Sequence, residues 1–592
     1  MGRRLLAVAA VSAALAFSSV AQAAEPRAQI KGVSDRTLLQ QIQRAVGEEP
    51  GTPANRIEAR RRARDAAESA TALLRTEGYY DYTVSPDIEG EGEHPQPVVT
   101  IDPGPRTRFG ESAITWMGTA PDATTEEAAR KAIALTPGAP ARSPDIIGAQ
   151  GRIVAVLRAR GYADAEAAPS PPVVDHADQT MRATFKISAG ALVRMDSLRL
   201  DTKGRTSLRW IQGLVPWKPG EVYKPDQVAE LERRLLETGV YDSVTVALAP
   251  APDAQGLRPV VVSLADRARR TLDFAAGYST TEGAAFDITY SFFNRLGRGD
   301  TLALEARLAQ IDSRFGPTLT LPDFWRPGQT LTASTDLFQT VAPAYTETGA
   351  EIRGDLTQRY GKTSYFSRGI QIVGSQIDDK ELGRIRIGAV RFIGALFLDR
   401  TDNTLDPRHG WKLEVRLQPT GIFGGETLGY LKATTQLSGY LPFGLDANTV
   451  LAGRVRLGTI LGGNIPRVPA SDRFFAGGGG SVRGYEYQSV GPSYPDNTPT
   501  GGLALFESTL ELRHRFAHLF GGNLGGVLFI DTGSVSQEIT PQFTHTATGV
   551  GFGVRYNLGF APIRADFAVP VNKLSGAGQA PFQIYISIGQ SF

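Results

Sequence analysis

Residues 411–418 read WKLEVRLQ, in which apolar and polar side chains alternate strictly. A period of two is typical of a β-strand with one apolar and one polar face. The same alternation returns at 271–278 (TLDFAAGY), at 302–308 (LALEARL) and at 549–559 (GVGFGVRYNLG). Because no helical periodicity accompanies these strands, lipid is the expected cover for their apolar face. The second half of the chain therefore predicts a transmembrane antiparallel β-barrel.

Periodicity alone leaves one alternative open, since a soluble sandwich buries the apolar faces of two sheets against each other. The beginning of the sequence favours the membrane. Residues 1–23 carry two arginines, an apolar run and an Ala-Gln-Ala site, which is typical of a secretory signal peptide. No later stretch reaches the ~20 apolar residues that a spanning helix needs. We therefore expect an exported chain without a transmembrane helix.

The barrel region is long enough for many strands. Residues 267–592, at about 20 residues for each strand with its turn, correspond to roughly sixteen strands. The last strand, read from Phe582, places apolar side chains on one face and ends on Phe592. The expected fold of this region is a barrel of about sixteen strands.

A smaller unit recurs three times before the barrel. Amphipathic stretches end at Gly78, Gly161 and Gly239, at intervals of about 80 residues. Glycine in this place is a common helix stop, because it adopts the left-handed conformation without strain. The order strand, helix, helix, strand, strand predicts three tandem α+β domains. Their expected boundaries are 24–104, 105–190 and 191–266.

Composition argues against several kinds of site. The chain has no cysteine, so disulfides and thiolate chemistry are excluded, and its net charge of +2 gives no general attraction to nucleic acid. His514 and His518 have a spacing known from metal sites, but they lie near a strand end. Asp531-Thr532-Gly533 is similar to an aspartic-protease motif, yet the sequence has no second copy for the required pair. We expect no enzyme activity, no metal and no cofactor.

One loop sequence stands apart. Residues 473–485 read RFFAGGGGSVRGY, with four glycines before Arg483 and aromatic residues on both sides. Taken alone, the segment is equally well interpreted as a flexible loop with a solvated arginine. The flanking strands favour a functional loop instead.

Four sequence patterns stand out: SVRGY (481–485), LFIDTG (528–533), TDNTLDPRHGWKL (401–413) and GFGVRYNLGFAPIRADFAVP (551–570). Together they resemble the outer-membrane assembly-factor superfamily, whose members join POTRA domains to a barrel insertase. The three α+β units resemble POTRA domains, although an unrelated α+β repeat stays an alternative. The terminal aromatic looks like the sorting signal of bacterial outer-membrane proteins.

The resemblance implies roles for particular residues. In the family, the loop folds back into the barrel lumen and its arginine pairs with an acidic residue of the wall, which here predicts that Arg483 contacts Asp531. The loop motif comprises Val482, Arg483, Gly484 and Tyr485. The implied wall partners are Phe529, Asp531, Gly533, Arg564 and Asp566.

The family also implies a seam between the first and last strands. Here these strands are expected near Thr271–Thr280 and Gln583–Phe592, and an openable seam would let client strands pair. The seam residues are Phe274, Ile586, Gly589 and Phe592. Gly589 either weakens the seam or relieves crowding, and both interpretations stay open.

Three POTRA copies and the FFAGG stretch look most like the barrel subunit of the translocation and assembly module, the TamA family. That resemblance implies a barrel in the outer membrane and POTRA domains in the periplasm. It implies insertion of autotransporter-type and other barrel proteins, and a long inner-membrane-anchored, periplasm-spanning partner that is TamB-like. The clients would be unfolded outer-membrane proteins. The alternative is a two-partner-type secretion transporter that passes its client through the lumen.

Overall fold

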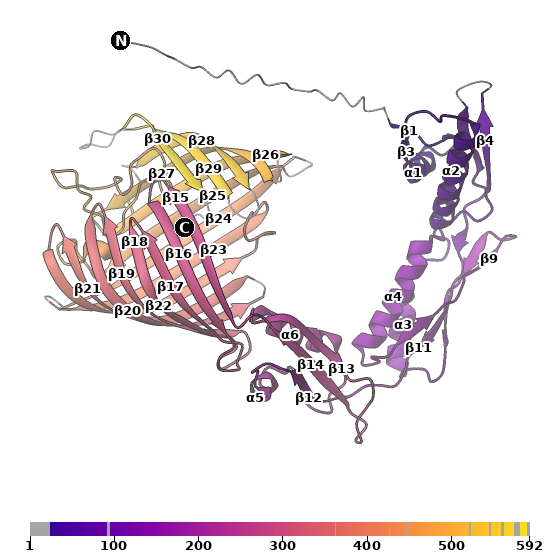
Figure 1. The fold of residues 1–592 in the computed structure, drawn as a ribbon, viewed down its shortest axis with the longest axis horizontal. Coiled ribbons are helices and arrows are strands. Elements are labelled where there is room, and N and C mark those ends of the chain that lie inside the picture. Colours follow the sequence, from indigo (N-terminus) through magenta and orange to yellow (C-terminus); the bar gives the residue numbers. More distant parts are fainter. Residues whose placement is uncertain are drawn as a thin grey trace, which may run out of the picture. The chain divides into compact units, whose positions relative to one another are not determined.

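The computed structural model describes residues 24–90, 95–361, 363–424, 427–444, 448–519, 522–543, 546–557, 562–572 and 580–588. The signal peptide expected at 1–23 lies outside them. Helices and short strands come first along the chain, and long strands follow (Figure 1). By compactness the chain forms two units, which are described separately. The larger unit contains the barrel and most of the third α+β domain.

The first α+β domain has a three-stranded sheet of order β2-β5-β4 and two helices. Its second helix ends at Glu77 because Gly78 takes a left-handed φ of 93° and closes the last turn. Ile42, Leu74 and Ile101 are fully buried in its core. The elements are β1 (Ala24–Pro26), β2 (Gln29–Lys31), α1 (Arg36–Val46), β3 (Glu48–Pro50), α2 (Arg56–Glu77), β4 (Thr83–Glu89) and β5 (Gln96–Asp102).

The second domain repeats this plan with a sheet of order β7-β11-β8, and a small sheet β6-β10-β9 is added to it. Ile153 and Leu157 of its second helix pack on Ile187 of the central strand. The elements are β6 (Arg108–Phe109), β7 (Ala113–Trp116), α3 (Ala123–Ile133), α4 (Ser143–Ala159), β8 (Glu166–Ala168), β9 (Val173–Asp175), β10 (Thr180–Arg182) and β11 (Thr184–Ser188).

The third domain has the sheet order β12-β14-β13. Each of the three sheets thus places the last strand of the repeated unit in its centre. The boundaries expected from the sequence fall after β5, after β11 and at the end of β14. The elements are β12 (Met195–Thr202), α5 (Leu208–Gln212), α6 (Pro225–Glu237), β13 (Tyr241–Leu248) and β14 (Arg258–Asp266).

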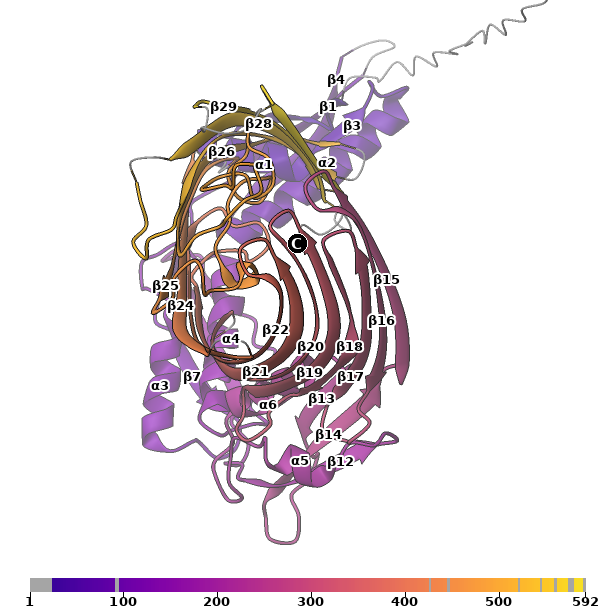
Figure 2. The ribbon, with the colours of Figure 1, turned by 90° about the vertical axis from the view of Figure 1, so that its left-hand side faces the viewer.

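Sixteen antiparallel strands then close into a barrel, which confirms the expected fold. Figure 2 shows the strands curving around a lumen, with the orange segment between β25 and β26 inside the ring. The strands are β15 (Arg270–Ser279), β16 (Gly283–Phe293), β17 (Thr301–Ala309), β18 (Asp312–Leu321), β19 (Gln329–Ala342), β20 (Tyr345–Tyr360), β21 (Ser364–Asp379), β22 (Gly383–Asp399), β23 (Gly410–Phe423), β24 (Leu428–Phe443), β25 (Thr449–Leu461), β26 (Ala504–Leu519), β27 (Gly522–Ser536), β28 (Ala547–Asn557), β29 (Pro562–Pro570) and β30 (Gln583–Ile588).

The two faces of the barrel differ as the alternation predicts. On β27, Leu528 and Ile530 are exposed on the outside, whereas Phe529 and Asp531 are buried on the inside. An outer face of exposed apolar side chains matches a lipid environment. Among the described residues, no helix has the length and apolar character needed to cross a membrane.

The third domain and the barrel meet at the β16–β17 turn. The Nδ2 of Asn294 donates to Oγ1 of Thr206 at 2.9 Å, and the amide of Ser207 donates to the carbonyl of Gly297 at 2.9 Å. Gly297 has φ 72°, and a Cβ on it would lie 2.4 Å from the carbonyl oxygen of Arg205. In the same turn, a Cβ on Gly299 would lie 2.9 Å from the ring of Trp210 and 3.0 Å from Cγ2 of Thr238, so the junction is closely packed.

Candidate functional site

The segment between β25 and β26 folds into the lumen and packs there. Val482 and Tyr485 are buried together with wall residues of several strands, among them Ile387 and Ile460. Arg483 is only 5% exposed. We call residues 470–503 the lumen loop. Most residues from 470 to 490 are buried, so this part of the loop is packed into the barrel core and is not a solvated connection.

The glycine run makes a tight bend just before the arginine. Gly477 and Gly478 have φ of 108° and 103°, which are strained for residues with side chains. Oγ of Ser481 accepts the amide of Gly477 at 2.9 Å and donates to the carboxylate of Glu507 on β26. The bend thereby directs Arg483 toward the wall formed by β26, β27 and β29.

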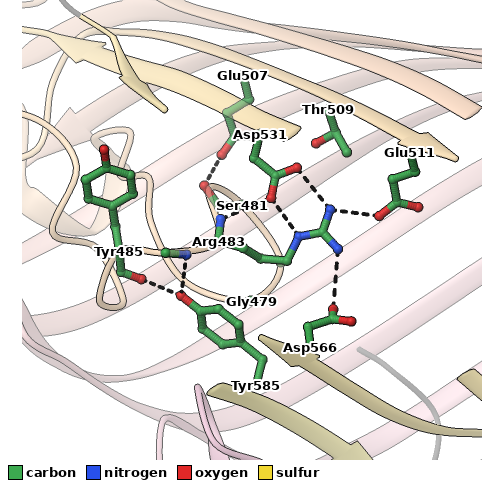
Figure 3. A network of polar contacts seen from close by, with 12 residues as sticks. Gly479, Ser481, Arg483, Tyr485, Glu507, Thr509, Glu511, Asp531, Asp566 and Tyr585 are labelled. Carbon is green, nitrogen blue, oxygen red and sulfur yellow. Dashed lines mark hydrogen bonds and ion pairs between the residues drawn. The ribbon is translucent and has the colours of Figure 1, made fainter. Parts of the chain in front are cut away.

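Arg483 meets three carboxylates, one from each of these strands (Figure 3). Its Nε lies 2.6 Å from Oδ2 of Asp531, and its Nη2 lies 3.0 Å from Oδ1, so this pair is bidentate. The same Nη2 donates to Glu511 at 2.7 Å, and Nη1 donates to Asp566 at 3.3 Å. The backbone amide of Arg483 also donates to Asp531, at 3.1 Å. The contact that the resemblance implied is present.

The charges around Arg483 are close to balanced. Arg513 pairs with Glu511 at 2.8 Å, and Arg555 pairs with Asp566. The guanidinium carbon of Arg483 lies 3.4 Å from the centre of the Phe529 ring, an attractive cation–π contact. Burial by itself disfavours the charge of Arg483, but the hydrogen bond and the charge of Asp531 outweigh it and raise the pKa above the ordinary arginine value. The arginine therefore remains charged at any physiological pH.

Two glycines of the predicted motifs make room for the loop. A Cβ on Gly533 would lie 2.7 Å from Cγ2 of Val482, so this glycine lets β27 and the loop approach closely. Gly484 has φ 100° and lies against the backbone of Val569. These contacts explain in steric terms why the two motifs contain glycine.

Tyr485, two residues after Arg483, fixes the loop to the wall at a second point. Its hydroxyl donates to the carbonyl of Asn572 at 2.7 Å and accepts the amide of Thr548 at 3.1 Å. The aromatic ring is buried, with 1% of the residue exposed. The three consecutive residues Arg483, Gly484 and Tyr485 therefore all contact the barrel wall.

Arg564, the last of the predicted barrel-wall partners, lies on the same face of β29 as Asp566. The contact from this strand to Arg483 is made by Asp566 and not by Arg564. Sequence reasoning missed Glu511 as a partner. A signal was present, because Glu507 and Glu511 alternate onto the inner face of β26 opposite the apolar outer side chains Leu510 and Leu512.

Sequence reasoning also missed a second anchor at the start of the loop. Nη2 of Arg391 on β22 lies 3.1 Å from both carboxylate oxygens of Asp472, and the hydroxyl of Tyr430 on β24 donates to the same group. Lys432 donates to the Asp472 carbonyl at 2.7 Å. The next residue, Arg473, is buried and donates to the carbonyls of Ile465, Val468 and Thr500. The sequence did carry a signal for this anchor, because the adjacent charged residues Asp472 and Arg473 lie just before the glycine-rich stretch.

The seam joins β15 and β30 as expected, in a specific register. Tyr278 pairs with Ile588 and Ser279 pairs with Ser587. The amide of Thr280 donates to the carbonyl of Ile586 at 3.1 Å, and its Oγ1 accepts the Ile586 amide at 3.2 Å.

The predicted seam residues do not all meet. Ile586 lies opposite Thr280, whereas Phe274 is paired with Ile288 of β16. Gly589 and Phe592 lie outside the described residues. The metal-like spacing of His514 and His518 falls on one strand, β26.

Comparison with known proteins gives two family matches. The Omp85 superfamily domain matches residues 294–592, and the first POTRA domain of TamA matches residues 27–103. The outer membrane protein assembly factor BamA of Neisseria meningitidis is 24% identical over 504 residues, which cover 78% of this chain and 61% of that protein. BamA of Neorickettsia risticii is 23% identical over 437 residues, which cover 70% of this chain and 57% of that protein. The chain thus spans about three fifths of these curated relatives.

The fold has a counterpart among solved structures. The crystal structure of BamA from Haemophilus ducreyi lacking POTRA domains 1–3 covers 81% of this chain and 99% of its own, with a TM-score of 0.69 at 18% identity. At this identity the likeness concerns the fold. The family match covers the barrel from β17 to β30, and the barrel architecture agrees with it. The chain therefore belongs to the Omp85 superfamily, as an outer-membrane barrel with POTRA domains in the periplasm.

Proposed function

We propose that this protein is an assembly factor that inserts autotransporter-type and other barrel proteins into the outer membrane. In this proposal, the POTRA domains dock the client and a TamB-like periplasm-spanning partner, and the seam templates the client's strands. The TamA-type first POTRA domain supports the choice within the superfamily. The domain boundaries at 104, 190 and 266 belong to the same proposal.

The observation that carries the proposal is the way the lumen is occupied. Asp472 fixes the loop to β22 and β24, and Arg483 fixes it to β26, β27 and β29. A client that passed through the lumen would have to break buried ion pairs at both ends, each costly to leave unpaired. A route between β15 and β30 breaks neither set.

The POTRA sheets offer places for extended chains. β2 and β4 are the edge strands of the first sheet, and β7 and β8 are the edges of the second. An added strand pairs with such an edge through main-chain hydrogen bonds, which accept many sequences. This chemistry suits unfolded clients that differ in sequence.

Locking the seam tests the route. Cysteines replace Ser279 and Ser587, which pair directly, and a chain without native cysteine gives an unambiguous disulfide. The control pair replaces Ser367 and Ala395, which are partners across β21 and β22. The measurement is insertion of a client barrel into vesicles that contain the full chain.

We expect oxidation of the seam pair to abolish insertion and reduction to restore it, while the control pair stays active in both states. If the locked seam still inserts clients, lateral templating is wrong. Release of a client across the locked barrel would then favour the two-partner-type secretion transporter.

A further inference from the structure

The lumen loop contacts both sides of the seam as well as the wall. The hydroxyl of Tyr585, on β30, accepts the amide of Gly484 at 3.0 Å and donates to the carbonyl of Tyr485 at 2.7 Å (Figure 3). Oγ1 of Thr281, in the turn that follows β15, accepts the amide of Gly479 at 3.3 Å. One continuous loop segment therefore binds the first and the last strand regions together.

The packing agrees with these hydrogen bonds. A Cβ built on Gly479 would lie 3.1 Å from Oγ1 of Thr281 and 3.1 Å from Cδ1 of Tyr585, so the bare backbone fills the space between them. A Cβ on the neighbouring Gly478 would also meet Thr281, at 3.1 Å. A Cβ on Gly480 would meet no atom within 4 Å. The close contact is thus specific to the two glycines that face the seam.

The loop is held unequally on the two sides of the seam. Arg483 and Tyr485 bind it to β26, β27, β28 and β29, which continue directly into β30. Thr281 is the contact to the β15 side that completes the bridge. If β15 and β30 separate while Arg483 stays bound, the loop must leave either Thr281 or Tyr585.

We infer that the lumen loop holds the seam closed through its contacts with Thr281 and Tyr585, which together we call the clasp. Thr281 and Tyr585 are positioning residues, because they couple the position of the loop to the separation of β15 and β30. The closed seam gains contacts that the open seam lacks, so the loop shifts the equilibrium toward closure. Coupling of this kind is reciprocal, and a locked seam must also hold the loop. The inference rests on the proposed insertion through the seam.

The test measures seam opening directly and not through insertion. Hydrogen exchange is followed by mass spectrometry on peptides that cover 583–588, in the full chain in lipid vesicles. The Ile586 amide, which bonds across the seam, reports each opening. Tyr585→Phe removes the hydroxyl and keeps the ring. Gly479→Ala disturbs the clasp from the loop, without any change in a seam strand.

We expect both variants to raise the exchange rate of these peptides roughly tenfold, the effect of losing one or two ordinary hydrogen bonds. Gly480→Ala is the matched glycine control, and Tyr290→Phe removes a tyrosine hydroxyl from β16, which does not take part in the seam pairing. Both controls should exchange at the wild-type rate. Heat-dependent gel mobility identifies any variant that does not fold.

Wild-type exchange in folded Gly479→Ala would overturn the clasp, because a purely local effect of Tyr585→Phe on β30 requires no loop. The Ser279→Cys/Ser587→Cys disulfide gives the reciprocal test, since locking the seam should slow exchange of the Gly479 region. These outcomes are independent of the insertion assay. A clasp can be found in a protein whose locked seam still inserts clients, and a seam-dependent insertase can lack the clasp.

Discussion

The side chain of Arg483 lies along the carboxylate of Asp531, with its Nε 2.6 Å from Oδ2 and its Nη2 3.0 Å from Oδ1. Asp531 is completely buried. The two residues are 48 positions apart in the chain and belong to a loop and to strand β27. A buried bidentate pair of this kind fixes both position and orientation, because the planar guanidinium matches the carboxylate only in narrow geometries.

Replacing Arg483 by alanine should destabilise the barrel by about 3–5 kcal/mol, because Asp531 would be left as an uncompensated buried charge. Denaturant unfolding of the purified full chain measures this loss. Arg384→Ala is the control, since that arginine pairs with Asp378 on the surface with side chains 69% and 44% exposed. Such surface pairs contribute about 0–1 kcal/mol. Equal unfolding midpoints for the two variants would contradict the anchoring role.

The three acidic partners should not contribute equally. Asp531→Asn should cost about 3 kcal/mol, because it removes the bidentate partner of a buried cation. Asp566→Asn should cost about 1 kcal/mol, because its 3.3 Å contact is the longest and Arg483 keeps two other carboxylates. The same unfolding assay ranks the two variants. A larger effect of Asp566→Asn would show that its pair with Arg555 dominates the network.

The contacts of Asp472 with Arg391 and Tyr430 hold the start of the lumen loop, so we expect their loss to release this part of the loop. Asp472→Ala removes the partner of buried Arg391, so we expect trypsin to cleave after Arg473 roughly tenfold faster than in the wild type. Asp496→Ala is the control in the same loop, because Asp496 pairs with Lys380 on an exposed surface. Unchanged cleavage after Arg473 would mean that the loop packing does not need the Asp472 carboxylate.

The junction of the third domain and the barrel can be tested with two glycines. Gly297→Ala places a Cβ at 2.4 Å from the carbonyl oxygen of Arg205, whereas a Cβ on Gly256 meets no atom within 4 Å. Both glycines have positive φ, 72° and 78°, so the conformational strain is similar. Gly297→Ala should therefore cost about 1–3 kcal/mol more than Gly256→Ala in thermal unfolding. Equal costs would show that the junction adjusts without strain.

Much of the architecture could be predicted from local pattern. The alternation in WKLEVRLQ and its relatives depends only on successive side chains pointing to opposite faces, so it indicates strands and their outer face without any knowledge of pairing. The helix stop at Gly78 is equally local, because a left-handed residue is cheap only for glycine. The family motifs added the pairing of Arg483 with Asp531.

The missed residues share a physical cause. Glu511 and Asp472 act through partners far away in the chain, Arg483 in the lumen loop and Arg391 on β22, and nothing within a few residues of either one marks that partner. The register between β15 and β30 is also not set by local sequence. Phe274 and Ile586 both lie on the outer face, yet strand closure places Ile586 opposite Thr280. A shift along the strands by two residues would preserve the alternation, so the sequence pattern does not distinguish these registers.

The sequence by itself determined what each segment can form: a strand with a lipid face, a helix that stops at glycine, and a loop with a charged residue between glycines and aromatics. These properties follow from side-chain chemistry over a few residues. The tertiary structure alone decided which distant groups meet. Closure of the barrel and the inward fold of the loop bring Arg483 to three strands and bring Gly479 between Thr281 and Tyr585. Contacts of this kind depend on the whole sheet, because its register and curvature set which inner side chains face the same point of the lumen.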